Sequence, residues 1–376
     1  KLYSAYNESD AIISKILKQY CYKNPLIVVD HNIQKSSEYF LDLLSQLTCN
    51  PSLIISINTT HEPSYTYLKE LTNQVRKITC DCVIGIGGGS TLDIAKTLAA
   101  LKTNDGEPLS YRGFDRLENQ SLPSIAIPTT AGTGSEVTYN ASFVDTKTNQ
   151  KMGINGRFTN PTHAILDAMW LETCPKNARI SAGIDALVHA IESFICNKAN
   201  PLTQFFAKEA FGLIYNSLTQ DKIEKLDGEN LQNLLLGSYM AGIAMTNSGS
   251  GIAAVLSYPT GVHFHVPHGI CGGIFISSAI EYNIKKGFLG YASLYDIVYP
   301  QNNKTLKEKN ISFHQLIKQL VDHLCIPQYL CEWGISKHNV DELLQHMIPM
   351  QAAFDQNPIT FRAKEDSLAI LKNHVK

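Results

Sequence analysis

The first 168 residues alternate short apolar runs with amphipathic segments, and this alternation constrains the fold more than any other feature of the chain. The runs PLIVVD (25–30), CVIGIG (82–87) and SIAIP (124–128) predict buried strands, and the segments 64–77 and 90–101 have helical spacing. Strands that alternate with helices need crossover connections, which build a parallel sheet with helices on both faces. We therefore predict a Rossmann-like α/β domain at residues 1–168.

The pattern changes after about residue 170, where long segments with apolar spacing of three and four replace the strand-like runs. Examples are 180–195, 201–218 and 229–245. Such segments predict an all-α second domain at residues 169–376. Two domains also suit the length, because a single hydrophobic core seldom grows beyond about 250–300 residues.

Composition excludes several classes of partner. The 32 basic and 34 acidic residues give a net charge of −2, and no block of like charge stands out, which argues against nucleic-acid binding and electrostatic membrane anchoring. No apolar run approaches the ~20 residues that span a bilayer, and the first residues lack the apolar core of a signal peptide. The nine scattered cysteines are expected to be reduced. We expect a cytoplasmic protein without nucleic-acid or membrane partners.

A glycine-rich turn follows the run at 82–87 and contains Gly87, Gly88, Gly89 and Ser90. Glycines let the backbone approach a pyrophosphate, whose charge is favoured at the N-terminus of the following helix. The turn lacks the Lys-Ser/Thr pair of a Walker loop and is not the usual G-x-G-x-x-G fingerprint. It predicts phosphate binding, with a plain tight turn between strand and helix as the alternative.

Hydroxyl groups follow the next predicted strand. Thr129, Thr130 and Thr133 come directly after the run at 124–128, at the carboxyl edge where open α/β sheets bind ligands. A Ser/Thr turn is the alternative. Asp30 ends the run at 25–30 and either accepts hydrogen bonds from an adenosine ribose or caps the next helix.

Four motifs together carry a family resemblance: GIGGGSTLDIAK (85–96), IPTTAGTGSEVT (127–138), GIDALVHAIESFI (183–195) and PHG (267–269). In order and spacing, over nearly the whole chain, the sequence resembles the iron-containing (group III) alcohol dehydrogenase family, which has a dehydroquinate synthase-like fold. The resemblance implies a nucleotide-binding domain, a helical domain, and a cleft between them for NAD(P) and a divalent metal. It also implies a homodimer or larger homo-oligomer.

The resemblance carries over a set of cofactor residues from the glycine turn, the threonine motif and the segment that follows it. These are Gly87, Gly88, Gly89, Ser90, Asp93, Thr129, Thr130, Thr133 and Lys151. Asp30 falls where NAD-preferring members have an aspartate, whose charge would repel a 2′-phosphate. The expected cofactor is therefore NAD.

The resemblance also implies a metal site. Asp185 and His189 are four residues apart, on one face of a predicted helix, and His268 of the PHG motif supplies a third ligand. The family's remaining histidine is expected fourteen residues before His268, and this chain has Ala254 there. Its histidine near the nicotinamide corresponds to Tyr258. We take Tyr258 and His268 as the catalytic residues.

Three protein ligands with an open position are typical of catalytic zinc, and two histidines with one carboxylate also suit ferrous iron. We expect Fe²⁺ or Zn²⁺ held by Asp185, His189 and His268. Two alternatives stay open. In one, His263 or His265, expected in a loop, replaces the missing ligand; in the other, the site binds no metal.

The implied reaction is the interconversion of a primary alcohol and its aldehyde by hydride transfer with NAD(H), the metal acting as a Lewis acid. The turn at 256–258 is similar to that of the branch containing phosphonoacetaldehyde reductases and 3-deoxy-octulosonate 8-oxidases. This similarity indicates a small polar or anionic substrate, which Arg112 could meet unless it is a surface residue. Alternatives are a sugar-acid alcohol oxidase of the same fold and a degenerate, non-catalytic nucleotide-binding member.

Overall fold

The computed structural model describes residues 1–58, 62–148 and 150–376 and divides the chain into two compact units. Unit 1 comprises Lys1–Pro175 and Asp227–Leu235, and unit 2 comprises Lys176–Leu226 and Leu236–Lys376. The first division lies seven residues after the boundary expected at residue 168.

The segment Asp227–Leu235, expected in the second domain, belongs to unit 1. Gln232 explains this difference. Its amide nitrogen donates to Ser4 Oγ at 3.0 Å and to the Leu166 carbonyl at 3.2 Å, and its amide oxygen accepts from the Ala168 N–H at 3.2 Å. These bonds attach the start of a helix to two strand ends far away in the sequence.

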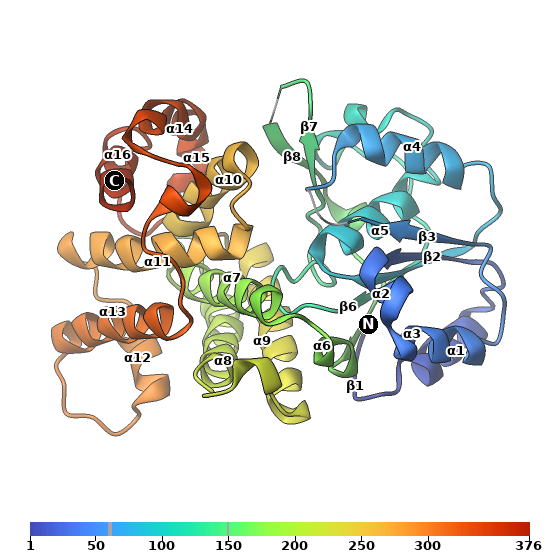
Figure 1. The fold of residues 1–376 in the computed structure, drawn as a ribbon, viewed down its shortest axis with the longest axis horizontal. Coiled ribbons are helices and arrows are strands. Elements are labelled where there is room, and N and C mark those ends of the chain that lie inside the picture. The colour runs from blue at the N-terminus through green and yellow to red at the C-terminus, as the bar shows by residue number, and fades with distance from the viewer. Residues whose placement is uncertain (59–61, 149) are drawn as a thin grey trace. The chain divides into compact units, whose positions relative to one another are not determined.

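Unit 1 is built on a six-stranded parallel sheet with the order β1-β9-β6-β4-β2-β3 (Figure 1), which confirms the predicted α/β class. Its strands are β1 (Leu2–Ala5), β2 (Pro25–Asp30), β3 (Leu53–Ile57), β4 (Cys82–Gly87), β6 (Ser124–Pro128) and β9 (His163–Asp167). A smaller sheet contains β5 (Gly113–Phe114), β8 (Gln150–Asn155) and β7 (Ser142–Asp145). The helices are α1 (Ser9–Tyr20), α2 (His31–Ser36), α3 (Glu38–Gln46), α4 (Tyr65–Val75), α5 (Gly89–Leu101) and α6 (Met169–Glu172).

Strand β4 lies inside the large sheet, and all of its residues are buried. It pairs with β2 on one side, with Val29 opposite Ile86, and with β6 on the other, with Gly87 opposite Pro128. Buried apolar residues of β2, β4, α4 and α5 form a continuous core. A strand buried on both faces needs an uninterrupted apolar run, and the sequence 82–87 has one.

The connections after β2 and β4 leave in opposite directions along the sheet. Strand β2 leads through α2 and α3 outward to β3, whereas β4 leads through α5 to β6 on its other side. The carboxyl ends of β2 and β4 therefore flank a topological switch point, which is where open α/β sheets bind ligands.

Strand β1 is one of the two edge strands and, among the described residues, pairs with β9 alone, Leu2 lying opposite Ala164 and Ala5 opposite Asp167. The Asp167 carboxylate accepts hydrogen bonds from the backbone N–H groups of Asn7 at 2.8 Å and Ser9 at 3.0 Å. It thereby satisfies amides at the start of α1.

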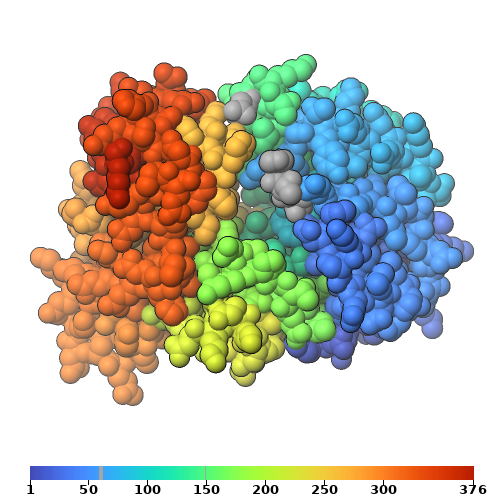
Figure 2. All heavy atoms as spheres, in the orientation of Figure 1, coloured from blue at the N-terminus to red at the C-terminus, as the bar shows by residue number. Residues whose placement is uncertain are grey.

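In its described residues unit 2 contains helices and no strand, which confirms the prediction of an all-α second half. Its helices are α7 (Lys176–Ile195), α8 (Pro201–Leu218), the last part of α9 (Gly228–Asn247), α10 (Ile252–Phe264), α11 (His268–Lys285), α12 (Ala292–Val298), α13 (Leu306–His323), α14 (Val340–Met347), α15 (Gln351–Phe354) and α16 (Glu365–His374). Helix α7 is central, because every residue from Gly183 to Ile195 is buried. Helices α12 and α13, in orange, form part of the surface (Figure 2).

Within the described chain, none of the helices has the length and apolarity needed to cross a membrane. All nine cysteines are free thiols, as expected from their scattered positions.

Candidate active site

Three potential metal ligands come together in unit 2. Asp185 and His189 lie one turn apart on α7, and His268 is the first residue of α11. The Nε2 atom of His189 is 3.7 Å from Asp185 Oδ1, and Nε2 of His268 is 3.8 Å from the same oxygen. Ligand atoms about 2.1 Å from a tetrahedral ion lie roughly 3.4 Å apart, so these separations suit a shared cation.

A glycine lets α11 begin so close to α7. A Cβ atom on Gly269 would lie 1.9 Å from the Ser181 carbonyl oxygen and 3.0 Å from Asp185 Cβ. Any side chain at this position would push the two helices apart. The glycine of the PHG motif therefore brings His268 within reach of Asp185.

Glu192 joins α7 to α10. Its buried carboxylate accepts hydrogen bonds from the backbone N–H groups of Gly251 at 2.8 Å, Ala253 at 2.6 Å and Ala254 at 3.2 Å. Burial raises the pKa of Glu192 to about 7, and the three N–H groups oppose that rise. Glu192 was not predicted from the sequence, although its seven-residue spacing from Asp185 places both on one face of α7.

Helix α10 presents Ala254 and Tyr258 one turn apart, on one face. The Tyr258 ring is tilted by 50° against the His268 ring, with 5.0 Å between their centroids. Ala254 is buried and its side chain offers no ligand atom. Among the described residues, the group able to hold a metal consists of Asp185, His189 and His268, whose ligand atoms lie within 4.8 Å of one another.

The two other histidines near the PHG motif take different positions. His263 belongs to the last turn of α10 rather than to a loop, and its ring stacks on His346 of α14 with centroids 3.7 Å apart. Burial and the neighbouring His346 lower the pKa of His263. His265 ends α10 in the left-handed conformation, with φ of 56°. In the part of the chain that is described, neither joins the three-ligand group.

The glycine turn and the threonine motif face each other at the carboxyl edge of the large sheet. The N–H of Thr129 donates to the Gly87 carbonyl at 3.0 Å. A Cβ atom on Gly88 would lie 3.2 Å from Thr130 Oγ1, and one on Gly89 would lie 2.6 Å from Thr133 Cγ2. Side chains on these glycines would fill the space beside the threonines, and their absence suits close backbone approach to a pyrophosphate.

Ser90 lies in the first turn of α5, and Asp30 ends β2, so both are at the switch point. Asp30 is also the N-cap of α2, because its Oδ1 accepts the Asn32 N–H at 2.8 Å. Lys151 on β8 forms an ion pair with Glu62, Nζ to Oε1, at 2.7 Å.

Asp93, expected at the cofactor, bonds to the end of the threonine motif (127–138) and to the first residue of β7. Its Oδ1 accepts from Ser135 Oγ at 2.6 Å, and its Oδ2 accepts from the Ser142 N–H at 2.8 Å. Arg112 bonds to Gln150 Oε1 at 2.9 Å and lies 3.6 Å from Asp145 Oδ2. Its contacts hold the β7–β8 hairpin.

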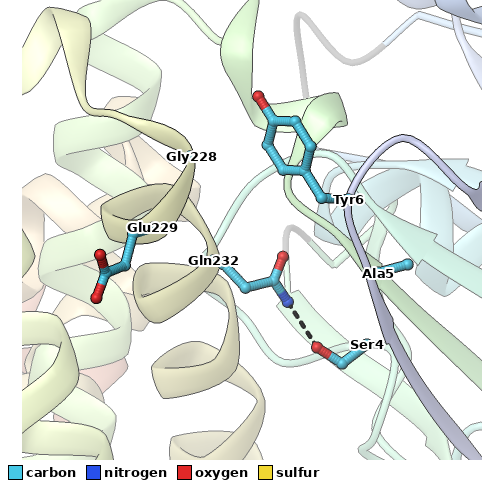
Figure 3. A pocket seen from close by; sticks show the side chains of 6 residues that line it. All are labelled: Ser4, Ala5, Tyr6, Gly228, Glu229 and Gln232. Atoms are coloured by element: carbon cyan, nitrogen blue, oxygen red, sulfur yellow. Dashed lines mark hydrogen bonds between the residues drawn. The ribbon is translucent and has the colours of Figure 1, made fainter.

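An open hollow of about 490 Å³ lies elsewhere in unit 1, where β1 ends and α9 begins. Figure 3 shows its lining residues, with the Gln232 amide bonded to Ser4. They are Ser4, Ala5, Tyr6, Gly228, Glu229 and Gln232. None of the residues predicted to bind cofactor or metal lies among them.

Comparison with known families agrees with this arrangement. The model of the family described as iron-containing alcohol dehydrogenase matches residues 6–168, and the model of its C-terminal part matches residues 179–375. The chain belongs to the iron-containing alcohol dehydrogenase family. This assignment confirms the predicted family and the predicted class of enzyme, an oxidoreductase.

Individual proteins similar to this chain are named as alcohol dehydrogenases or aldehyde reductases. Alcohol dehydrogenase 4 of Schizosaccharomyces pombe is 28% identical, over 93% of this chain and 84% of its own length. The NAD-dependent methanol dehydrogenase of Bacillus methanolicus is 34% identical over 59% of this chain and 58% of its own. Sulfoacetaldehyde reductase of Bilophila wadsworthia is 27% identical over 83% of this chain and 81% of its own length. The crystal structure of a 1,3-propanediol oxidoreductase has the same fold, with a TM-score of 0.90 and 24% sequence identity. The match covers 99% of this chain and 97% of the oxidoreductase chain.

Proposed function

We propose that this protein interconverts a primary alcohol and its aldehyde, with NAD(H) as the hydride carrier and a divalent metal bound by Asp185, His189 and His268. The observation that carries the proposal is the convergence of these three ligand atoms from α7 and α11 in a member of this family. The name of the methanol dehydrogenase relative supports NAD as the cofactor.

The donor set fits Fe²⁺ or Zn²⁺, because two imidazoles and one carboxylate are ligands that both ions accept. When bound, the metal supplies Lewis-acid stabilisation of negative charge on the reacting oxygen, and NAD supplies the hydride acceptor. His268 and Tyr258 are the proposed catalytic residues. The Tyr258 ring packs against His268 and orients it from α10, and Glu192 holds the first turn of that helix in place.

The proposed cofactor residues lie at the switch point of the large sheet. Backbone N–H groups of Gly88, Gly89 and Ser90 at the start of α5 favour the pyrophosphate, because a helix N-terminus attracts negative charge. Thr130 and Thr133 line the facing wall. Asp30, at the end of the neighbouring strand, disfavours a 2′-phosphate, and we propose a preference for NAD over NADP.

We propose a small polar or anionic aldehyde as the substrate. Support comes from residues 256–258, which lie within α10 and not in the expected turn, because their sequence is similar to that of the phosphonoacetaldehyde reductase branch. The relative named sulfoacetaldehyde reductase, whose name specifies an anionic aldehyde, also supports this substrate class. We also propose that the enzyme works in the cytoplasm, as a homodimer or larger homo-oligomer. Its nine free cysteines suit a reducing compartment.

The test combines metal analysis of freshly purified protein with NADH oxidation on a panel of short-chain, sulfonated, phosphonated and sugar-acid aldehydes. We expect bound iron or zinc, turnover of at least one aldehyde and weaker activity with NADPH. Oxygen consumption without NAD would instead identify an oxidase. Absence of both metal and turnover would identify a degenerate member.

A further inference from the structure

Lys96 is a buried cation in the middle of α5, and its side chain is only 2% exposed. Its ammonium donates to the carbonyl oxygens of Ser135 at 2.9 Å and Thr138 at 3.1 Å. It also lies 3.2 Å from Asp93 Oδ1. The lysine therefore ties α5 to the last four residues of the threonine motif, 135–138.

The bonds continue from this lysine to the expected cofactor site. Asp93 accepts from Ser135 Oγ at 2.6 Å, and the N–H of Ser135 donates to Thr133 Oγ1 at 3.2 Å. Thr133 in turn lies against Gly89, because a Cβ on that glycine would come within 2.6 Å of the threonine. One chain of contacts thus runs from the buried ammonium to the first turn of α5.

Burying an ammonium group is costly unless hydrogen bonds and an opposite charge compensate it. Burial lowers the pKa of Lys96, whereas Asp93 and then Glu136 favour its charged form. An apolar side chain would fill the same space without that cost, but it could not hold two carbonyl groups. The two hydrogen bonds from Lys96 therefore hold the backbone of residues 135–138 in one conformation.

We propose that Lys96, together with Asp93, is a positioning residue of the dinucleotide site: it fixes the threonine segment onto α5, so that the glycine turn and the threonines form one rigid cradle. This inference rests on the proposed function. A preformed cradle binds more tightly because less conformational freedom is lost on binding.

The test compares Lys96→Met with the matched control Lys102→Met. Lys102 is the C-cap residue of the same helix and also donates to backbone carbonyls, those of Val75 at 2.9 Å, Arg76 at 3.2 Å and Ile78 at 2.6 Å. NADH binding is titrated by fluorescence at a temperature where all variants are folded, and Tm is measured alongside. We expect Lys96→Met to raise the Kd for NADH about tenfold or more, which corresponds to ~1.4 kcal/mol. Lys102→Met should lower Tm and leave that Kd unchanged.

The measured Kd for NADH and the Tm together decide whether Lys96 positions the dinucleotide site. An unchanged Kd in Lys96→Met together with a lowered Tm would reduce Lys96 to a structural role and overturn the inference. If Lys96→Met does not fold, Asp93→Asn, which keeps the size of the side chain, must weaken NADH binding for the inference to stand. Failure of the wild-type protein to bind NADH would overturn the proposed function, and the inference with it.

Discussion

Gly269 on α11 lies so close to Ser181 on α7 that a methyl group on its Cα would come within 1.9 Å of the serine's carbonyl oxygen. Backbone cannot yield as a flexible side chain can, so Gly269→Ala must displace the start of α11. Because His268 is the preceding residue, we expect loss of metal to a chelator to become at least about tenfold faster, a change in the range found when supporting residues of metal sites are altered.

Gly272→Ala on the same helix is the matched control for Gly269→Ala. Its added Cβ would meet Val188 Cγ2 at 3.3 Å, a side-chain contact that can adjust. Its metal retention should stay near that of the wild type. Equal retention in the two variants would contradict the proposed role of Gly269.

Ala254→His should restore a fourth protein ligand. The Ala254 N–H is held by Glu192, and Tyr258 one turn later packs against His268, so an imidazole at 254 would start beside the three-ligand group. We expect metal loss to a chelator to slow by about 10–100-fold, since a new ligand should matter at least as much as a supporting residue. Turnover could fall if the added ligand blocks the substrate oxygen.

His263→Ala serves as the control for that prediction. His263 stacks on His346, and its removal should leave metal retention unchanged. If His263→Ala or His265→Ala strips the metal while Ala254→His has no effect, the three-ligand assignment is wrong.

Gly88→Val should abolish NADH binding while the protein still folds. The φ of −74° and ψ of −177° at Gly88 are open to any residue, but the new side chain would occupy the space beside Thr130. Fluorescence titration with NADH checks the loss, and circular dichroism and metal content check the fold. Wild-type NADH affinity in this variant would show that the glycine turn does not form the dinucleotide site.

Glu136 should make stability depend on pH. Burial raises the pKa of its carboxyl to about 7, and its Oε1 has no hydrogen-bond partner among the described residues. Between the ordinary value of ~4.3 and about 7, the folded state keeps a proton that the unfolded state releases. The free energy of unfolding should therefore fall as pH rises through this window, by up to about 1.4 kcal/mol per pH unit.

Glu136→Gln cannot titrate, so its free energy of unfolding should lose this downward slope. Urea unfolding at several pH values between about 5 and 7 checks the difference. Glu118→Gln, at an exposed position, is the control and should follow the wild type. Parallel curves for wild type and Glu136→Gln would show that Glu136 is ionised in the folded protein throughout.

The sequence predicted the central strands β2, β4 and β6 to the residue but did not predict β1, the strand at one edge of the sheet. Strands β4 and β6 are continuous apolar runs that end at glycine or proline. Such a run indicates a buried strand, and the glycine or proline marks the residue where the strand ends. Strand β1 has four residues, alternately exposed and half-buried, and in the described part of the chain its strand partner is β9. Its pairing depends on residues far along the chain, and no local pattern shows that.

The candidate ligands Asp185, His189 and His268 were predicted together because the resemblance to the family carries them over motif by motif, and the fold brings their ligand atoms within 4.8 Å of one another. Lys96 and Glu192 were missed for a common reason. Both bond to backbone groups, Lys96 to carbonyls and Glu192 to N–H groups. Every residue type has a backbone carbonyl, and all except proline have a backbone N–H, so the amino-acid sequence does not show which residues are the partners. Only the fold shows which peptide groups reach them.

The pairing of β1 with β9 has a consequence for biosynthesis. The Asn7 N–H bonds to a carboxylate 160 residues further along, so β1 stays unpaired until β9 has been synthesised. Long-range contacts of this kind form slowly and leave strand edges exposed in the meantime. Gln232, which bonds to Ser4, arrives later still. This edge of the sheet can therefore be completed only after residue 232 has been synthesised, later than the strands at its centre, and until then it is exposed to chaperones and to wrong pairing.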